Sequence, residues 1–163
     1  MNKQQSGPKH SREVGAEQRL SGCLAPPLPL HRFPGIPFEY AEILKSKGIN
    51  HSGNFMDMAE TAQQCILLAR TTGIPENRIS ELRSLCDLAR IRGIDPRLAR
   101  VIYQVNIRSV GKMAKEDPAS LYQKISKCSE AYAEVITSLQ VEEMDAWIEC
   151  AKIILLSEGR SPE

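Results

Sequence analysis

The sequence has no long apolar run, and no stretch approaches the roughly 20 consecutive apolar residues that a membrane-spanning helix requires. It also has no signal-peptide pattern, because the polar start MNKQQSGPKHSREV is followed only by the proline-broken segment CLAPPLPL. Charge of one sign is not in excess either: 21 Lys and Arg face 20 Asp and Glu, which leaves a net charge of +1. These absences predict a soluble, cytoplasmic protein with no membrane partner, whose electrostatic interactions come from local patches.

Close cysteine pairs are also absent. The five cysteines have no CxxC spacing and no neighbouring histidine, so the sequence predicts no metal site and no cofactor. Their odd number, wide spacing and the missing secretion signal argue against a disulfide framework. Cys23 is expected to be a free thiol in a loose N-terminal segment. The other four fall on expected helices and are interpreted as mostly buried small hydrophobes: Cys65, Cys86, Cys128 and Cys150.

The sequence lacks a recognisable catalytic constellation. It has no phosphate-cradling glycine loop and no dinucleotide fingerprint. The three histidines, His10, His31 and His51, lie far apart and accompany no candidate nucleophile or paired carboxylate. An enzyme is therefore not expected.

Helical periodicity begins after a leader. Residues 1–32 are rich in Ser, Gly, Pro and Gln, carry no apolar stripe, and are expected to be disordered. From residue 33 onward apolar residues recur at steps of three and four, which predicts an all-α domain over residues 33–157, followed by a tail at 158–163. Three of these stripes are Ile79, Leu82, Cys86 and Ala89; Leu98, Val101, Ile102 and Val105; and Met144, Trp147, Ile148, Ala151 and Leu155.

Two segments of the chain can be aligned with each other. Residues 33–44 match residues 91–102, with Gly35 opposite Gly93, and Gly48 then falls opposite Asn106. Glycine and asparagine tolerate positive φ best, so the last pairing predicts the same turn in both copies. We assign repeat one to about 33–70, repeat two to about 79–127 and a closing helix to about 140–156.

Each unit is interpreted as helix, Gly-Ile hairpin, helix, Gly/Asn-Ile turn and helix, which resembles the helix-hairpin-helix motif. The wider layout resembles the family called domain of unknown function 4332. The resemblance covers roughly residues 33–156, including LCDLARIRGI at 85–94, the helix start Asp117-Pro118 and WIECAK at 147–152. It implies a compact array of short helices. In helix-hairpin-helix proteins, hairpin amides and the next helix N-terminus hold a DNA phosphate without reading bases.

Carried onto this sequence, the phosphate site is the second hairpin, with Gly93, Ile94 and the start of the following helix. The basic residues around it are Arg90, Arg92, Arg97, Arg100, Arg108 and Lys112. These six cations and the single acid Asp95 give residues 90–112 a charge of +5, whereas four basic and eight acidic residues give 118–163 a charge of −4. Arg97 and Arg100 are expected to face solvent, opposite Leu98 and Val101.

Two residues depart from the phosphate-binding pattern. Asp95 replaces the second hairpin glycine, and its carboxylate is expected to cap its own helix and repel a phosphate. Pro37 at the matching place in the first copy has no N–H to donate, so the first hairpin is expected to be structural. The leading hypothesis is a sequence-nonspecific DNA-binding module. Three alternatives remain: a solvated basic face that binds no ligand, a protein-interaction or scaffold domain, and a dimer formed by pairing of the basic and acidic ends. The oligomeric state is left open.

Overall fold

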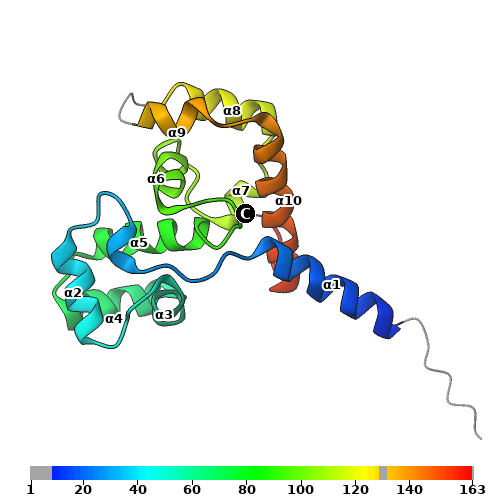
Figure 1. Ribbon diagram of the computed structural model, residues 1–163. Helices are drawn as coiled ribbons and strands as arrows, with labels where there is room; N and C mark the ends of the chain where they lie inside the picture. The colour runs from blue at the N-terminus through cyan, green and yellow to red at the C-terminus, as the bar shows by residue number, and fades with distance from the viewer. Residues whose placement is uncertain (1–8, 129–131, 163) are drawn as a thin grey trace, which may run out of the picture.

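The computed structural model describes residues 9–128 and 132–162. Over these ranges the chain forms ten α-helices and one 3₁₀ turn and no strand, which confirms the all-α prediction (Figure 1). The elements are α1 (Lys9–Cys23), η1 (Leu30–Arg32), α2 (Phe38–Ser46), α3 (Ser52–Met58), α4 (Ala62–Thr72), α5 (Glu76–Leu88), α6 (Pro96–Gln104), α7 (Val110–Met113), α8 (Pro118–Ser126), α9 (Ala133–Thr137) and α10 (Val141–Ser157).

Local sequence signals set most helix starts. The Asp95 carboxylate accepts a hydrogen bond from Leu98 N at 2.8 Å, and Asp117 caps α8 in the same way, each followed by a proline at the first helical position. The sequence places the cap of the last helix at Thr137 or Ser138, which is wrong. The start of α10 is instead a reciprocal capping box between Gln140 and Glu143, because Thr137 ends α9.

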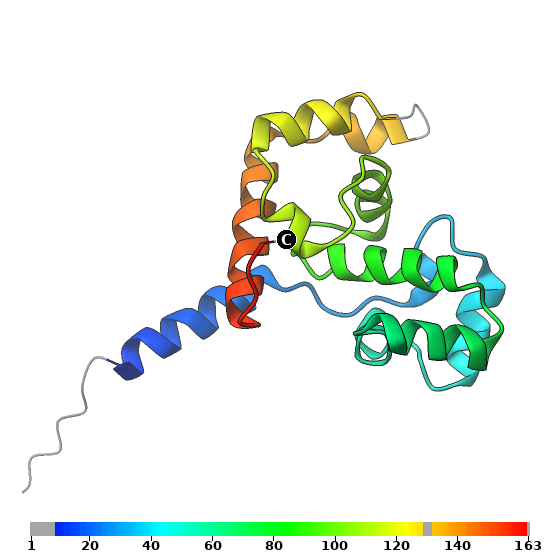
Figure 2. The same cartoon turned by 180° about the vertical axis from the view of Figure 1, so that it is seen from behind.

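Helix α5 lies between two groups of helices. It packs on α3 and α4 on one side and on α6 on the other, while α10 packs on α7 and α8. Figures 1 and 2 show α2, α3 and α4 at one end of the molecule and α8, α9 and α10 at the other. The apolar stripes predicted for α5 and α10 are buried in one continuous core.

The aligned turns share a left-handed backbone. Gly35 and Gly93 have φ of 80° and 94°, and Gly48 and Asn106 have φ of 81° and 67°. Asn106 is the one non-glycine residue with positive φ among those the structure describes. Gly48 and Asn106 thus both have the left-handed backbone that the alignment predicts.

The expectation of a disordered leader is wrong for the described part of residues 1–32; residues 1–8 lie outside the described ranges. Residues 9–23 form α1, and Leu30 in η1 is 2% exposed. The expectations of a free thiol at Cys23 and of no disulfide are also wrong, because a disulfide joins Cys23 to Cys150 in α10, with the Cα atoms 5.0 Å apart. Periodicity does not reveal α1, because it packs through a few residues near its C-terminal end, such as Leu20 and Cys23, rather than along a full stripe.

The remaining cysteines follow the prediction more closely. Cys65 and Cys86 are buried, and Cys128 is half-buried. Burial raises the pKa of the Cys65 thiol, and burial beside Asp87 raises the pKa of the Cys86 thiol well above its ordinary value. Both thiols therefore stay protonated near neutral pH, which makes them poor nucleophiles.

The disulfide links residues 127 positions apart, so it encloses most of the chain. Constraining a loop of this length in the unfolded state stabilises the fold by up to about 5 kcal/mol in the chain-entropy model. We expect Cys150→Ser to lower the free energy of unfolding by about 2–5 kcal/mol in urea denaturation of the oxidised protein. Cys128→Ser is the matched control, and equal midpoints for the two variants would contradict a structural disulfide.

Candidate nucleic-acid interface

The Gly93 turn, residues 90–95, joins α5 to α6 and contains the centre of the expected phosphate site. A Cβ built on Gly93 would lie 2.9 Å from Trp147 Nε1, so the glycine lets the indole of α10 approach the turn closely. Trp147 is 3% exposed, in agreement with its interpretation as a core residue. Ile94 is 2% exposed. One side of the turn is thus packed inside the protein.

The segment that follows α1 pairs with the other side of the turn. Arg92 N donates to Cys23 O and Ala25 N donates to Arg90 O, both at 2.8 Å. The guanidinium of Arg92 also donates to Ser21 O at 3.2 Å and to Leu24 O at 3.1 Å. Arg92 therefore lies at the C-terminal end of α1, where a positive charge is favourable, although the residue as a whole is exposed.

Arg100 does not face solvent, so that expectation is wrong. It is 7% exposed, its Nε donates to Pro34 O at 2.7 Å, and its Nη1 lies 2.5 Å from Glu81 Oε1. A Cβ on Gly35 would lie 2.7 Å from Arg100 Nη2. The guanidinium of Arg100 packs directly on the Gly35 turn, residues 33–37, whereas Arg97 is exposed as expected.

Arg78 completes this contact. Its Nη1 lies 2.5 Å from Glu81 Oε2, and its Nη2 donates to Gly35 O at 2.8 Å. We call Arg78, Glu81 and Arg100 the Gly35 clamp, since two cations share one carboxylate while both hold carbonyls of the turn. The clamp fixes the Gly35 turn against α5 and α6 and removes Arg100 from the accessible charge.

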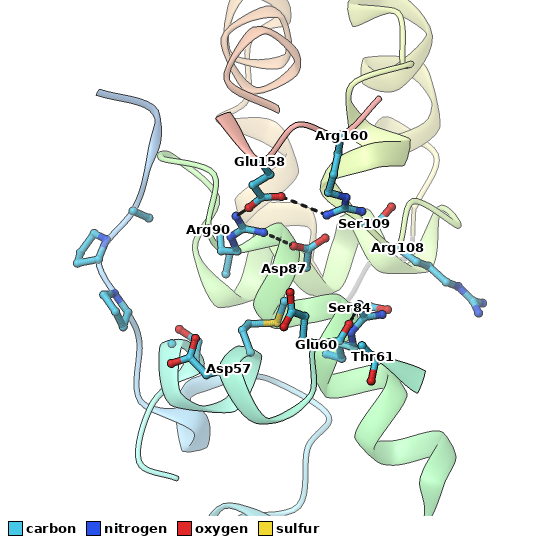
Figure 3. Close-up of a pocket in the computed structure, with 18 residues that line it drawn as sticks. Asp57, Glu60, Thr61, Ser84, Asp87, Arg90, Arg108, Ser109, Glu158 and Arg160 are labelled. Atoms are coloured by element: carbon cyan, nitrogen blue, oxygen red, sulfur yellow. Dashed lines mark hydrogen bonds and ion pairs between the residues drawn. The ribbon is translucent and has the colours of Figure 1, made fainter. Parts of the chain in front are cut away.

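Arg90 is also engaged within the protein. Its guanidinium pairs with Asp87 Oδ1 at 2.8 Å and with Glu158, and Asp87 Oδ2 accepts from Val110 N at 2.8 Å (Figure 3). Burial alone would lower the pKa of Arg90, but the charges and hydrogen bonds of Asp87 and Glu158 outweigh it and raise the pKa above the ordinary value. Arg90 is therefore charged and internally neutralised.

A cleft of about 850 Å³ lies beside this pair, bounded by residues 25–27, α3, α5 and residues 158–160. Its charged lining residues are Arg83, Arg90, Arg108 and Arg160 on the basic side, and Asp57, Glu60, Asp87 and Glu158 on the acidic side. Four charges of each sign cancel, so the cleft does not select for an anion. In Figure 3, Arg108 extends away from the other labelled side chains.

Besides Arg92, three of the predicted basic site residues are exposed: Arg97, Arg108 and Lys112. Arg108 stacks over the Tyr103 ring, 4.9 Å from its centroid. Arg97 and Lys112 make no ion pair with any residue the structure describes. With Arg90 and Arg100 neutralised, the exposed cations are these three and Arg92, against Asp95, which gives +3 instead of the +5 counted from sequence.

The described ranges contain neither a metal-binding cluster nor a membrane-spanning helix. No group of three or more His, Cys, Asp or Glu is placed there to hold a metal ion. None of the helices in these ranges is long and apolar enough to cross a membrane.

Over the described ranges the architecture is that of an all-α protein with left-handed Gly-Ile turns at Gly35, Gly48, Gly73 and Gly93. Residues 34–154 match the family described as Domain of unknown function (DUF4332), and the chain belongs to this family. The family resemblance expected from sequence is thereby confirmed. No curated protein and no solved structure matches the chain.

The Gly35 clamp makes a strong mutational prediction. Glu81→Gln leaves two guanidinium groups facing each other with their shared carboxylate removed, and breaking a buried pair in this way costs about 3–5 kcal/mol. We expect a loss of that size in urea denaturation. Glu149→Gln, which breaks an exposed pair with Lys152, serves as the control and should change stability by less than about 1 kcal/mol. Equal losses for both variants would contradict the clamp.

The packing of Trp147 on Gly93 leads to a second mutational prediction. Gly93→Ala and Gly48→Ala both force a left-handed alanine, which costs about 1–2 kcal/mol, but nothing lies within 4 Å of a Cβ at Gly48. Gly93→Ala also displaces the indole, so it should lower the unfolding free energy further, by at least about 1 kcal/mol. Thermal and urea unfolding of the two variants, compared side by side, measure the difference, and identical values would refute close packing of Trp147.

Proposed function

We propose that the chain is a non-enzymatic, sequence-nonspecific nucleic-acid-binding module of the helix-hairpin-helix type, which contacts the phosphates of duplex DNA. The observation that carries this proposal is the exposed charge between residues 92 and 112. Four cations there are exposed, of which Arg92 also donates to Ser21 O and Leu24 O, and the single acid, Asp95, is held as a helix cap at 2.8 Å from Leu98 N. Such a surface attracts a polyanion without reading its bases.

Side chains, rather than turn amides, make the phosphate contacts in this proposal. The Gly93 turn is packed between Trp147 and residues 23–25. The Asp95 side chain accepts a hydrogen bond from Leu98 N in the first turn of α6. Gly93 and Ile94 therefore support the surface from within. Arg97, Arg108 and Lys112 provide the charge, and Arg92 adds to it at the edge of the turn.

The test is fluorescence anisotropy of the full chain with a labelled duplex at 50 and 150 mM salt. Three phosphate contacts, from Arg97, Arg108 and Lys112, predict a roughly 20-fold loss of affinity over this range. The combined variant Arg97→Glu, Arg108→Glu and Lys112→Glu should bind at least tenfold more weakly at low salt. A control with the same change in charge replaces three exposed cations of the first copy, Lys45, Lys47 and Arg70, with Glu. It should keep affinity within about threefold.

Two results would contradict the proposal: no binding at 50 mM salt, or equal losses in the two triple variants. Circular dichroism and urea denaturation of each variant show whether a loss reflects binding or folding. Equal losses would mean that total charge, and not the surface between residues 92 and 112, governs association.

A second candidate is a protein-interaction module. Large apolar side chains stand exposed on three helices of the first copy: Phe38 in α2 at 62%, Met58 in α3 at 53% and Leu67 in α4 at 61%. Exposed apolar residues of this size are enriched where partners bind. Folded protein that binds no DNA at low salt would favour this candidate, whose affinity should not respond to the charge reversals.

A further inference from the structure

Helix α1 is attached to the rest of the protein at its C-terminal end. The Cys23–Cys150 disulfide joins it to α10, and residues 23–25 pair with residues 90–92 through Arg92 N to Cys23 O and Ala25 N to Arg90 O, both 2.8 Å. We call the disulfide together with this pairing the α1 latch. On the α1 side, every contact of the latch comes from the last turn of the helix or from the residues directly after it.

Beyond the α1 latch, α1 contacts the rest of the protein mainly through α10. Figures 1 and 2 show the helix projecting from the body of the molecule, and its one substantial packing partner is α10. Glu13, Val14 and residues 16–19 are exposed. A helix of 15 residues is marginally stable in water when tertiary contacts do not support it. The position of α1 therefore depends on the α1 latch together with its packing on α10.

The α1 latch also engages part of the proposed DNA-binding surface. Arg92 donates to Ser21 O and Leu24 O, so its guanidinium is bound to the end of α1 while the latch is closed. The same segment covers one side of the Gly93 turn. Displacing residues 21–25 would free the Arg92 donors and uncover that side of the turn.

We propose that the α1 latch is redox-controlled, and that reduction of Cys23–Cys150 by a dithiol releases α1 and makes Arg92 available to phosphate. This inference rests on the proposed function, because it assigns a form of regulation to that surface. The reducible bond is the one disulfide among the described residues, and it cross-links α1 to α10. Oxidation closes the latch again.

The exchange proceeds through the more accessible sulfur. Cys150 is half-buried whereas Cys23 is 7% exposed, so a thiolate of the reductant attacks Cys150 Sγ and expels Cys23 as a thiolate, which takes up a proton. The second thiolate of the reductant then attacks its own sulfur in the mixed disulfide and releases Cys150. The dithiol becomes a disulfide, and two electrons and two protons pass to the protein.

The first experiment measures release of α1 in the full chain. Oxidised protein and protein reduced with dithiothreitol are compared by trypsin cleavage after Arg19 and by hydrogen exchange over residues 13–25. Reduction should speed cleavage at least tenfold and remove protection. Cys150→Ser should behave as reduced protein without any reductant, and Cys128→Ser should respond to reductant as wild type does.

Equal cleavage and exchange in the oxidised and reduced wild type would overturn the latch. This comparison needs no substitution, so it stands even where Cys150→Ser fails to fold. Exchange protection in α5 shows that the reduced protein keeps its core. Thiol alkylation and mass measurement in acid-quenched, denatured samples give the redox state, with two more alkylated cysteines expected in the reduced form.

The second experiment titrates the same samples with labelled duplex at 50 mM salt. Reduced protein should bind about three- to tenfold more tightly than oxidised protein, and Arg92→Gln should abolish this difference. Release of α1 without DNA binding in either state would overturn the proposed function and leave the latch standing. Binding of equal affinity in both states would overturn control of Arg92 while leaving the proposed function standing.

Discussion

The ion network of the Gly35 clamp constrains the rest of the structure. Burying a guanidinium costs several kcal/mol unless its charge and donors are satisfied. Arg100 meets this requirement through Glu81 on α5 and the Pro34 carbonyl of the first turn. Because its partners come from two separate elements, the arginine fixes α6, α5 and the Gly35 turn relative to one another. Arg100 therefore stabilises the fold, and its charge is not available to bind a ligand.

The charge distribution follows from such internal pairing. Arg90 is neutralised by Asp87 and Glu158, and the neighbouring cleft has equal numbers of basic and acidic lining residues. Between residues 90 and 112, the exposed positive charge is therefore confined to Arg92, Arg97, Arg108 and Lys112. The exposed net charge of residues 90–112 is +3, which is smaller than the +5 counted from sequence. Of these four cations, Arg92 is bound to the end of α1, because its guanidinium donates to Ser21 O and Leu24 O.

Much of the fold could be predicted from sequence, because its signals are local. The caps at Asp95 and Asp117, the left-handed turn at Asn106 and the stripes of α5 and α10 each depend on residues a few positions apart. The candidate site was predicted less well. Periodicity identifies the faces of a helix but not what covers them, so it could not reveal a contact between Arg100 and Pro34, 66 residues apart. The pairing of Cys23 with Cys150 spans 127 residues and leaves no pattern between them.

The central claim is that DNA phosphates are bound on the surface between residues 92 and 112. The most direct measurement is an amide chemical-shift titration of isotopically labelled full chain with unlabelled duplex. The account expects the largest shifts at Arg92, Arg97, Arg108 and Lys112 and their chain neighbours, fading as salt is raised. Shifts confined to the helices that carry Phe38, Met58 and Leu67, or no shifts at all, would contradict it.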